Sequence, residues 1–239
     1  MIEQLTSAAF WLALGNIILV NIVLSGDNAI VIALAARGLP PRQQRRAIRY
    51  GSAGAIILRI VLTMSAATML TLPYLKIIGA VLLFYIGAQL LSQETADSQM
   101  DAHGTLSAAV RTILAADLVM SLDNVLGVAA AAKGNLVLLV AGLVISIPLI
   151  IFGSGLILRL MQRAPVIILL GAALLGYLAG EMLFSDVALR PWIGAHLPGH
   201  EFTVAHAPIV MSIPGMVLAV SVVVAGRLLA WRRQTVTKI

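Results

Sequence analysis

Seven long apolar segments dominate the sequence, and each is long enough to cross a bilayer as an α-helix, which takes about 20 residues. Their approximate bounds are 8–36, 46–71, 74–91, 107–132, 136–158, 165–184 and 209–230. Only 11% of the residues are charged, against about 25% in a typical soluble domain. The sequence therefore predicts an all-α membrane protein with seven transmembrane helices.

The basic residues are distributed unevenly between the two sides of the membrane. Of the 16 Lys and Arg residues, twelve fall in alternate loops and the C-terminal tail, three fall in the other loops, and Arg59 lies within a span. The positive-inside rule then places the N-terminus outside and the C-terminus in the cytoplasm. The expected location is the cell (plasma or inner) membrane. The net charge of +6 is explained by this topology, so no nucleic-acid partner is expected.

A short polar motif occurs twice inside the apolar segments. It reads SGDN at Ser25–Asn28 and SLDN at Ser121–Asn124, and four residues before each serine stand Asn21 and Asp117. The third and sixth spans also resemble each other. Because each half contains three spans, the second copy must lie upside down relative to the first, as in secondary transporters with a site near the midplane. The expected organisation is repeat 1 over 1–91, a cytoplasmic linker over 92–106, inverted repeat 2 over 107–184, an outer loop over 185–208, and a last helix with its tail over 209–239.

The paired motifs carry carboxylates to the middle of the membrane. Helical rise places the two motif aspartates about 15 Å from the nearest membrane face, where an ionised carboxylate costs about 2.5–3.5 kcal/mol. Ser, Gly, Asp and Asn are also poor helix formers, so a helix break at Ser25–Gly26 is expected, with freed carbonyls as further ligands. An all-oxygen donor set suits Mg²⁺, Ca²⁺ or Mn²⁺. The candidate metal ligands are Asp27, Asp117, Asp123, Asn28, Asn124 and Asn21.

Arg59 is the only basic residue at mid-span, and an unpaired charge there is costly. We expect its guanidinium within hydrogen-bonding reach of Asp27, Asp117, Asp123 or Glu181. Together with a bound divalent cation it would neutralise the three aspartates. Glu181 is open to three interpretations: a proton carrier, a partner of Arg59, or an interfacial residue without a role. The competing interpretation of the polar set is structural, with aspartates paired to Arg59 and amides bonding between helices.

These residues resemble the TerC family of integral membrane proteins, and specifically its short YjbE-type branch. The resemblance rests on SGDN and SLDN in the first and fourth of seven spans, each preceded by Asn or Asp. It implies manganese export, with the motif residues carrying the acidic site. One departure is Leu122, where the first copy has Gly26, so the second helix break is expected to be milder.

The predicted function is a secondary transporter that exports a hard divalent cation, with Mn²⁺ first, by alternating access. A Ca²⁺ or other cation/H⁺ antiporter is an alternative, and a membrane-protein assembly factor without transport is another. An intramembrane aspartyl protease is disfavoured, because its G-x-G-D motif is not matched and Asn follows each Asp. We therefore expect no enzyme activity and no cofactor apart from the transported ion. The chain gives no specific support for a homo-oligomer.

Overall fold

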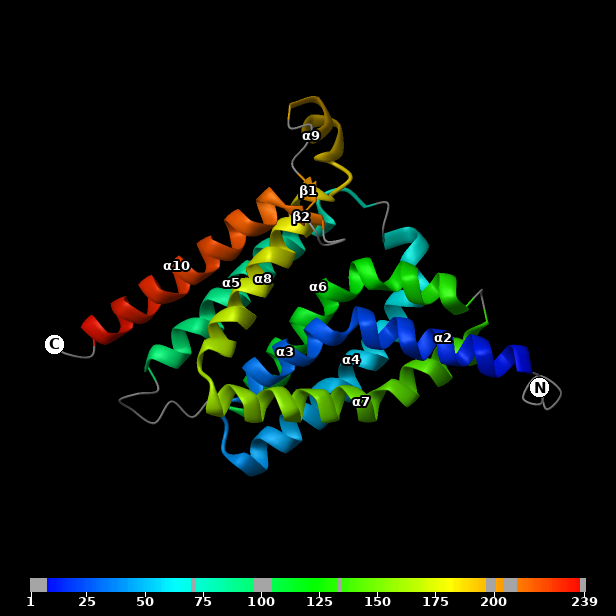
Figure 1. Ribbon diagram of the computed structural model, residues 1–239, viewed down its shortest axis with the longest axis horizontal. Coiled ribbons are helices and arrows are strands. Elements are labelled where there is room, and N and C mark those ends of the chain that lie inside the picture. The colour runs from blue at the N-terminus through cyan, green and yellow to red at the C-terminus, as the bar shows by residue number, and fades with distance from the viewer. Residues whose placement is uncertain are drawn as a thin grey trace. The chain divides into compact units, whose positions relative to one another are not determined.

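The computed structural model describes residues 8–69, 72–96, 105–132, 135–196, 201–203 and 210–236. Within these ranges some side chains lie outside the description, including that of Asp123. Nearly all of the described chain is helical (Figure 1). The elements are α2 Ala8–Leu24, α3 Gly26–Ala36, α4 Pro41–Met69, α5 Leu75–Ala96, α6 Leu106–Ala132, α7 Leu136–Arg163, α8 Val166–Phe184, α9 Arg190–His196, β1 Glu201–Thr203, β2 Val210–Ser212 and α10 Ile213–Val236.

Among the described residues, five helices are long and apolar enough to cross a membrane: α4, α5, α7, α8 and α10. Helices α2 and α3 form a sixth candidate if they are taken as one span, bent by 49°. Helix α6 has 27 residues, but many side chains in its C-terminal part lie outside the description. The chain is thus a helical, multi-pass membrane protein, and the seven-helix inverted repeat stays a prediction.

The helices gather into two compact units, which divide the chain differently from its two sequence halves. One unit comprises Met1–Thr68 and Thr105–Arg159, and the other comprises Met69–Gly104 and Leu160–Ile239. Each unit therefore combines helices from both halves of the sequence. The proposed boundaries of the repeats, linker and outer loop stay predictions.

In the first unit, α2 and α3 pack along α6, and glycines allow further close approaches. A Cβ at Gly51 of α4 would lie 2.7 Å from Ile113 Cδ1 of α6. One at Gly142 of α7 would lie 2.4 Å from Ile17 Cγ2 of α2. Because real Cβ atoms do not approach so closely, a larger side chain at either glycine would force the neighbouring isoleucine to shift. The packing therefore depends on small residues, as is usual between membrane helices.

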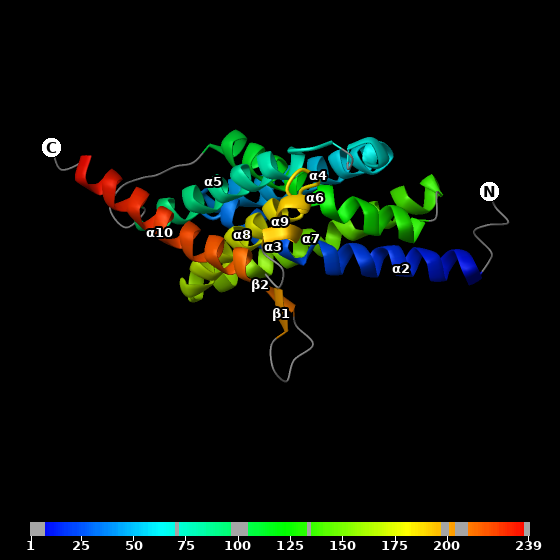
Figure 2. The same cartoon turned by 90° about the horizontal axis from the view of Figure 1, so that it is seen from above.

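In the second unit, α5, α8 and α10 lie side by side (Figures 1 and 2). The tightest approach is between α8 and α10: a Cβ on Gly176 would lie 2.5 Å from the Leu218 carbonyl oxygen, and one on Gly180 would lie 2.6 Å from Gly215 Cα. The neighbours here are backbone atoms, which cannot rotate away. The spacing of Gly176 and Gly180 is the G-x-x-x-G pattern of close helix pairs in membranes.

The predicted break at Ser25–Gly26 is present, since α2 ends at Leu24 and α3 begins at Gly26. By contrast, α6 continues as a helix through Ser121–Asn124. The two motif copies therefore differ in backbone. The difference follows the sequence, because glycine costs about 1 kcal/mol in a helix relative to alanine, whereas Leu122 favours the helix.

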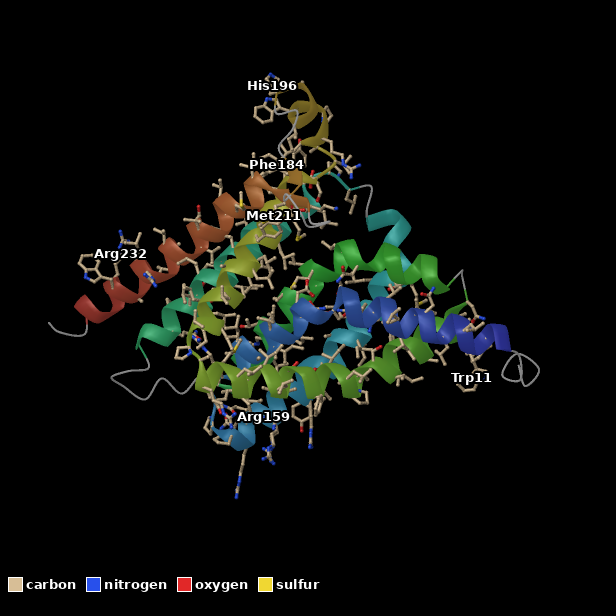
Figure 3. The ribbon with its side chains drawn as sticks, viewed as in Figure 1. Trp11, Arg159, Phe184, His196, Met211 and Arg232 are labelled. Atoms are coloured by element: carbon tan, nitrogen blue, oxygen red, sulfur yellow. The ribbon has the colours of Figure 1, made fainter. Side chains whose placement is uncertain are left out.

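The loop after α8 has structure that the sequence analysis did not predict. It holds the short helix α9, whose last residue, His196, lies at its tip with its ring stacked on Trp192 (Figure 3). It also holds an antiparallel pair of strands, β1 and β2, in which Phe202 lies opposite Met211. Each strand has three residues, which is too short for an alternating pattern to be recognisable in the sequence.

Candidate functional site

The guanidinium of Arg59, which α4 carries, lies in the packed interior of the first unit. Arg59 is 1% exposed and is the largest of the fully buried side chains in the described chain. Its Nη2 donates to Asp117 Oδ1 at 2.6 Å in a buried ion pair. The pairing expected of Arg59 is therefore present, and Asp117 is the carboxylate that provides it.

Three further bonds hold the same guanidinium. Nε donates to Ser121 Oγ at 3.1 Å, and Nη1 donates to Asn21 Oδ1 at 2.7 Å and to Ser25 Oγ at 2.5 Å. All three nitrogens of the guanidinium are therefore bonded. A buried charge that has both a counter-ion and an acceptor for each of its nitrogens is the arrangement that offsets its loss of hydration.

The two motif copies converge on this one guanidinium with matching internal geometry. In the first copy Ser25 Oγ donates to Asn21 Oδ1 at 3.2 Å, and in the second Ser121 Oγ donates to Asp117 Oδ2 at 3.1 Å. In each case the serine lies four residues after its acceptor, one helical turn away. The N/D-x3-S part of the repeat therefore forms two similar hydroxyl–acceptor pairs around one cation.

The hydrogen bonds of Ser25 to Asn21 and Arg59 explain why this serine does not cap α3. Ser25 stands at the N-cap of α3 with φ −116° and ψ 7°, yet its side chain makes no capping bond. Its hydroxyl is committed to Asn21 and Arg59 instead. A serine at an N-cap ordinarily accepts a bond from the first turn of its helix. Here that role passes to Asp27, whose Oδ1 accepts from the Asn28 N–H at 2.8 Å.

Asp27 and Asn28 lie in the first turn of α3. Asp27 is half-buried and close enough to Arg59 and Asp117 to interact electrostatically with both. Asn28 is 3% exposed, and within the described chain neither its Oδ1 nor its Nδ2 has a hydrogen-bond partner. Asn21 Nδ2 is likewise buried without one. Since buried polar atoms are nearly always paired, these amides are candidates to meet a ligand.

The remaining predicted site residues are only partly described. The side chain of Asp123 lies outside the described residues, and Asn124 is half-buried on α6. Glu181 belongs to α8 of the second unit and is not among the partners of Arg59. Among the described residues no three His, Cys, Asp or Glu side chains are grouped so that they could hold a metal. A complete ligand set is therefore a prediction that requires Asp123.

Two features are not predicted from the sequence. One is the role of the Ser25 and Ser121 hydroxyls, for which the recurrence of serine four residues after Asn or Asp is the available signal. The other is Asp186. It is fully buried just past α8, where its carboxylate accepts from the backbone N–H groups of Tyr74, Lys76, Ile77 and Ala188 at 2.8–3.3 Å.

Comparison with known proteins places the chain in a family. Residues 6–234 match the family described as "Integral membrane protein TerC family". The chain belongs to the TerC family. Bacillus subtilis YjbE, described as an uncharacterized membrane protein, is 42% identical over 177 residues, which cover 74% of this chain and 81% of that one. The Escherichia coli K12 inner membrane protein YgdQ is 31% identical over 189 residues, covering 72% and 79%. No solved structure matches the chain.

Proposed function

We propose that this TerC-family protein is a secondary transporter that exports a hard divalent cation, with Mn²⁺ the first candidate. The observation that carries the proposal is the Asp27–Asn28 pair within the broken span α2–α3. It offers a carboxylate and a buried amide whose oxygen has no partner in the described chain. Oxygen donors of these two kinds are what Mn²⁺, Mg²⁺ and Ca²⁺ accept. Manganese in particular is supported by family resemblance.

The cation would be held by the carboxylates of Asp27, Asp117 and Asp123, with amide oxygens from Asn28, Asn124 and Asn21. A break in a membrane helix beside such a group is typical of transporter sites, where freed backbone lines a cavity. Buried carboxylates that bind a metal must be deprotonated, so loading is expected to weaken in acid.

The direct test is a flux assay in proteoliposomes with Mn²⁺, Ca²⁺, Mg²⁺ and Zn²⁺, each with and without a pH gradient. We expect Mn²⁺ flux in the wild type and none in Asp27→Asn. The matched control is Asp97→Asn, the same chemical change in the 92–106 linker, which should transport like the wild type. Flux that depends on the pH gradient would identify a cation/H⁺ antiporter. Absence of flux for all four ions would favour the assembly-factor alternative.

A further inference from the structure

The Arg59 cluster, formed by Arg59 and its four partners Asp117, Ser121, Asn21 and Ser25, bears on how a metal could bind at this site. Asp117 is one of the predicted metal ligands, but both of its oxygens are already engaged: Oδ1 by Arg59 and Oδ2 by the Ser121 hydroxyl. The Arg59 guanidinium has bonds to four side chains. In this structure the Asp117 carboxylate is therefore paired with a cation of the protein itself, the Arg59 guanidinium.

A metal and Arg59 cannot use Asp117 together at low cost. A divalent ion on the Asp117 carboxylate would lie within a few ångströms of the guanidinium, and like charges at such distances repel strongly in a weakly polar interior. Whichever Asp117 oxygen ligated the metal would also already accept a hydrogen bond, Oδ1 from Arg59 Nη2 at 2.6 Å and Oδ2 from Ser121 Oγ at 3.1 Å. The two cations are therefore competitors for one carboxylate.

We propose that Arg59 is a tethered competitor of the transported cation: it occupies Asp117 in the substrate-free carrier and is displaced when the metal binds. This inference rests on the proposed function and specifies how the same site is regulated. The Asn21–Ser25 and Asp117–Ser121 pairs hold the guanidinium in this substrate-free state. In the empty carrier the Arg59 guanidinium neutralises the Asp117 carboxylate, so that no proton is needed. When Arg59 returns to Asp117, it helps to displace the bound metal.

Competition has a consequence that a purely structural ion pair does not share. If the metal-competent state, with Arg59 withdrawn, is only a fraction of the population, the apparent affinity is reduced by that fraction. Weakening the hold on Arg59 should therefore tighten metal binding. If Arg59 had only a structural role, the opposite would be expected, because its loss would distort the site and weaken metal binding.

The experiment is a Mn²⁺ titration by calorimetry on purified protein in detergent. Arg59→Gln removes the charge, and we expect on the order of tenfold tighter binding. Arg49→Gln is the matched control, since Arg49 is an exposed arginine on the same helix, and its affinity should equal that of the wild type. Folding of every variant is checked by gel filtration and thermal unfolding.

Arg59→Gln leaves Asp117 buried without its counter-ion and can fail to fold, so a milder variant is included. Ser121→Ala removes one acceptor of Arg59 and one donor to Asp117 but changes no charge. It should tighten Mn²⁺ binding several-fold. Its control is Ser154→Ala, a buried serine that bonds to the Ile150 carbonyl of its own helix and should have no effect.

The outcomes separate the inference from the proposed function. Tighter binding in Ser121→Ala, and in Arg59→Gln where it folds, supports the competition. Wild-type or weaker affinity in the folded variants, with the wild type binding Mn²⁺, overturns the competition and leaves the transport proposal standing. No Mn²⁺ binding in the wild type or in any variant overturns both.

Discussion

Single residues determine how the buried charges of the first unit are stabilised, and some of these residues could be predicted from the sequence. Arg59 could be identified because it is the only basic residue at mid-span, and Asp117 was among its four expected partners. The serines could not be ranked, because serine is common in membrane helices and forms bonds within its own helix, as Ser146 and Ser154 do here. Only the spatial convergence of two distant motifs distinguishes Ser25 and Ser121.

The two described aspartates should respond differently to the same substitution. Asp117→Asn removes the counter-ion of a fully buried arginine, and breaking such a pair costs about 3–5 kcal/mol. Asp27 is half-buried and makes no ion pair in the described structure, so Asp27→Asn should fold almost normally. We expect a clear loss of thermal stability in the first variant, little in the second, and loss of Mn²⁺ flux in both. Equal stability of the two variants would contradict the assigned roles.

At the scale of helices and loops, the apolar segments predicted a nearly all-helical chain with several membrane-span candidates, and the residue types predicted the break at Ser25–Gly26. What the sequence could not provide was the pairing of helices. Close approaches such as α8 with α10 depend on glycines that occur throughout this chain, which has 20 of them. Only some of these glycines face another backbone; the G-x-x-x-G spacing distinguishes Gly176 and Gly180 but does not identify the partner helix.

The packing of α8 on α10 gives a prediction with an internal control. Gly176→Ala would bring a Cβ to 2.5 Å from the Leu218 carbonyl oxygen, whereas Gly155→Ala on α7 would meet nothing within 4 Å. The first substitution forces two helix backbones apart, and overpacking of this kind costs about 1–3 kcal/mol. The second replaces glycine in a helix by alanine and should be neutral or stabilising by up to about 1 kcal/mol. Thermal unfolding in detergent measures both, and a harmless Gly176→Ala would mean that the helices are further apart.

Asp186 joins two elements of the second unit, because its carboxylate at the end of α8 caps the N-terminus of α5. Tyr74, which precedes α5, has φ of 67°, a rare conformation for a non-glycine residue, and its N–H is one of the donors. Burial by itself raises the pKa of the Asp186 carboxyl, but the backbone N–H donors of Ala188, Tyr74, Ile77 and Lys76 outweigh it and lower the pKa below its ordinary value.

The lowered pKa of Asp186 has a defined effect on stability. A carboxyl with a depressed folded-state pKa contributes stability above its unfolded pKa of about 3.9, and this contribution is lost as the pH falls through the lower folded value. Asp186→Asn should therefore reduce stability at neutral pH by about 1.5–3 kcal/mol, typical of bonds to a charged group, and flatten the loss of stability below about pH 4. Thermal midpoints from pH 3 to 7 measure this, and parallel curves for variant and wild type would contradict it.

At the scale of the whole chain, the two-copy motif is the feature that the structure clarifies most. Equivalent serine–acceptor pairs from both halves meet at Arg59, which is what an internal repeat related by approximate twofold symmetry would produce. Each compact unit also contains helices from both halves. An inverted repeat requires in addition that corresponding helices cross the membrane in opposite directions, and this depends on topology.

Membrane topology can be tested directly because the chain contains no cysteine, so single cysteines can be introduced without background labelling. The basic-residue asymmetry predicts an outside N-terminus and a cytoplasmic tail. We expect a membrane-impermeant thiol reagent to label Gln4→Cys and Gly199→Cys in intact cells, and Ser98→Cys and Lys238→Cys only after the cells are opened. Labelling of Gln4→Cys and Lys238→Cys on the same side would require an even number of spans. With an even number of spans, the chain could not consist of two three-span halves and a last helix, and the argument for an inverted second half would fail.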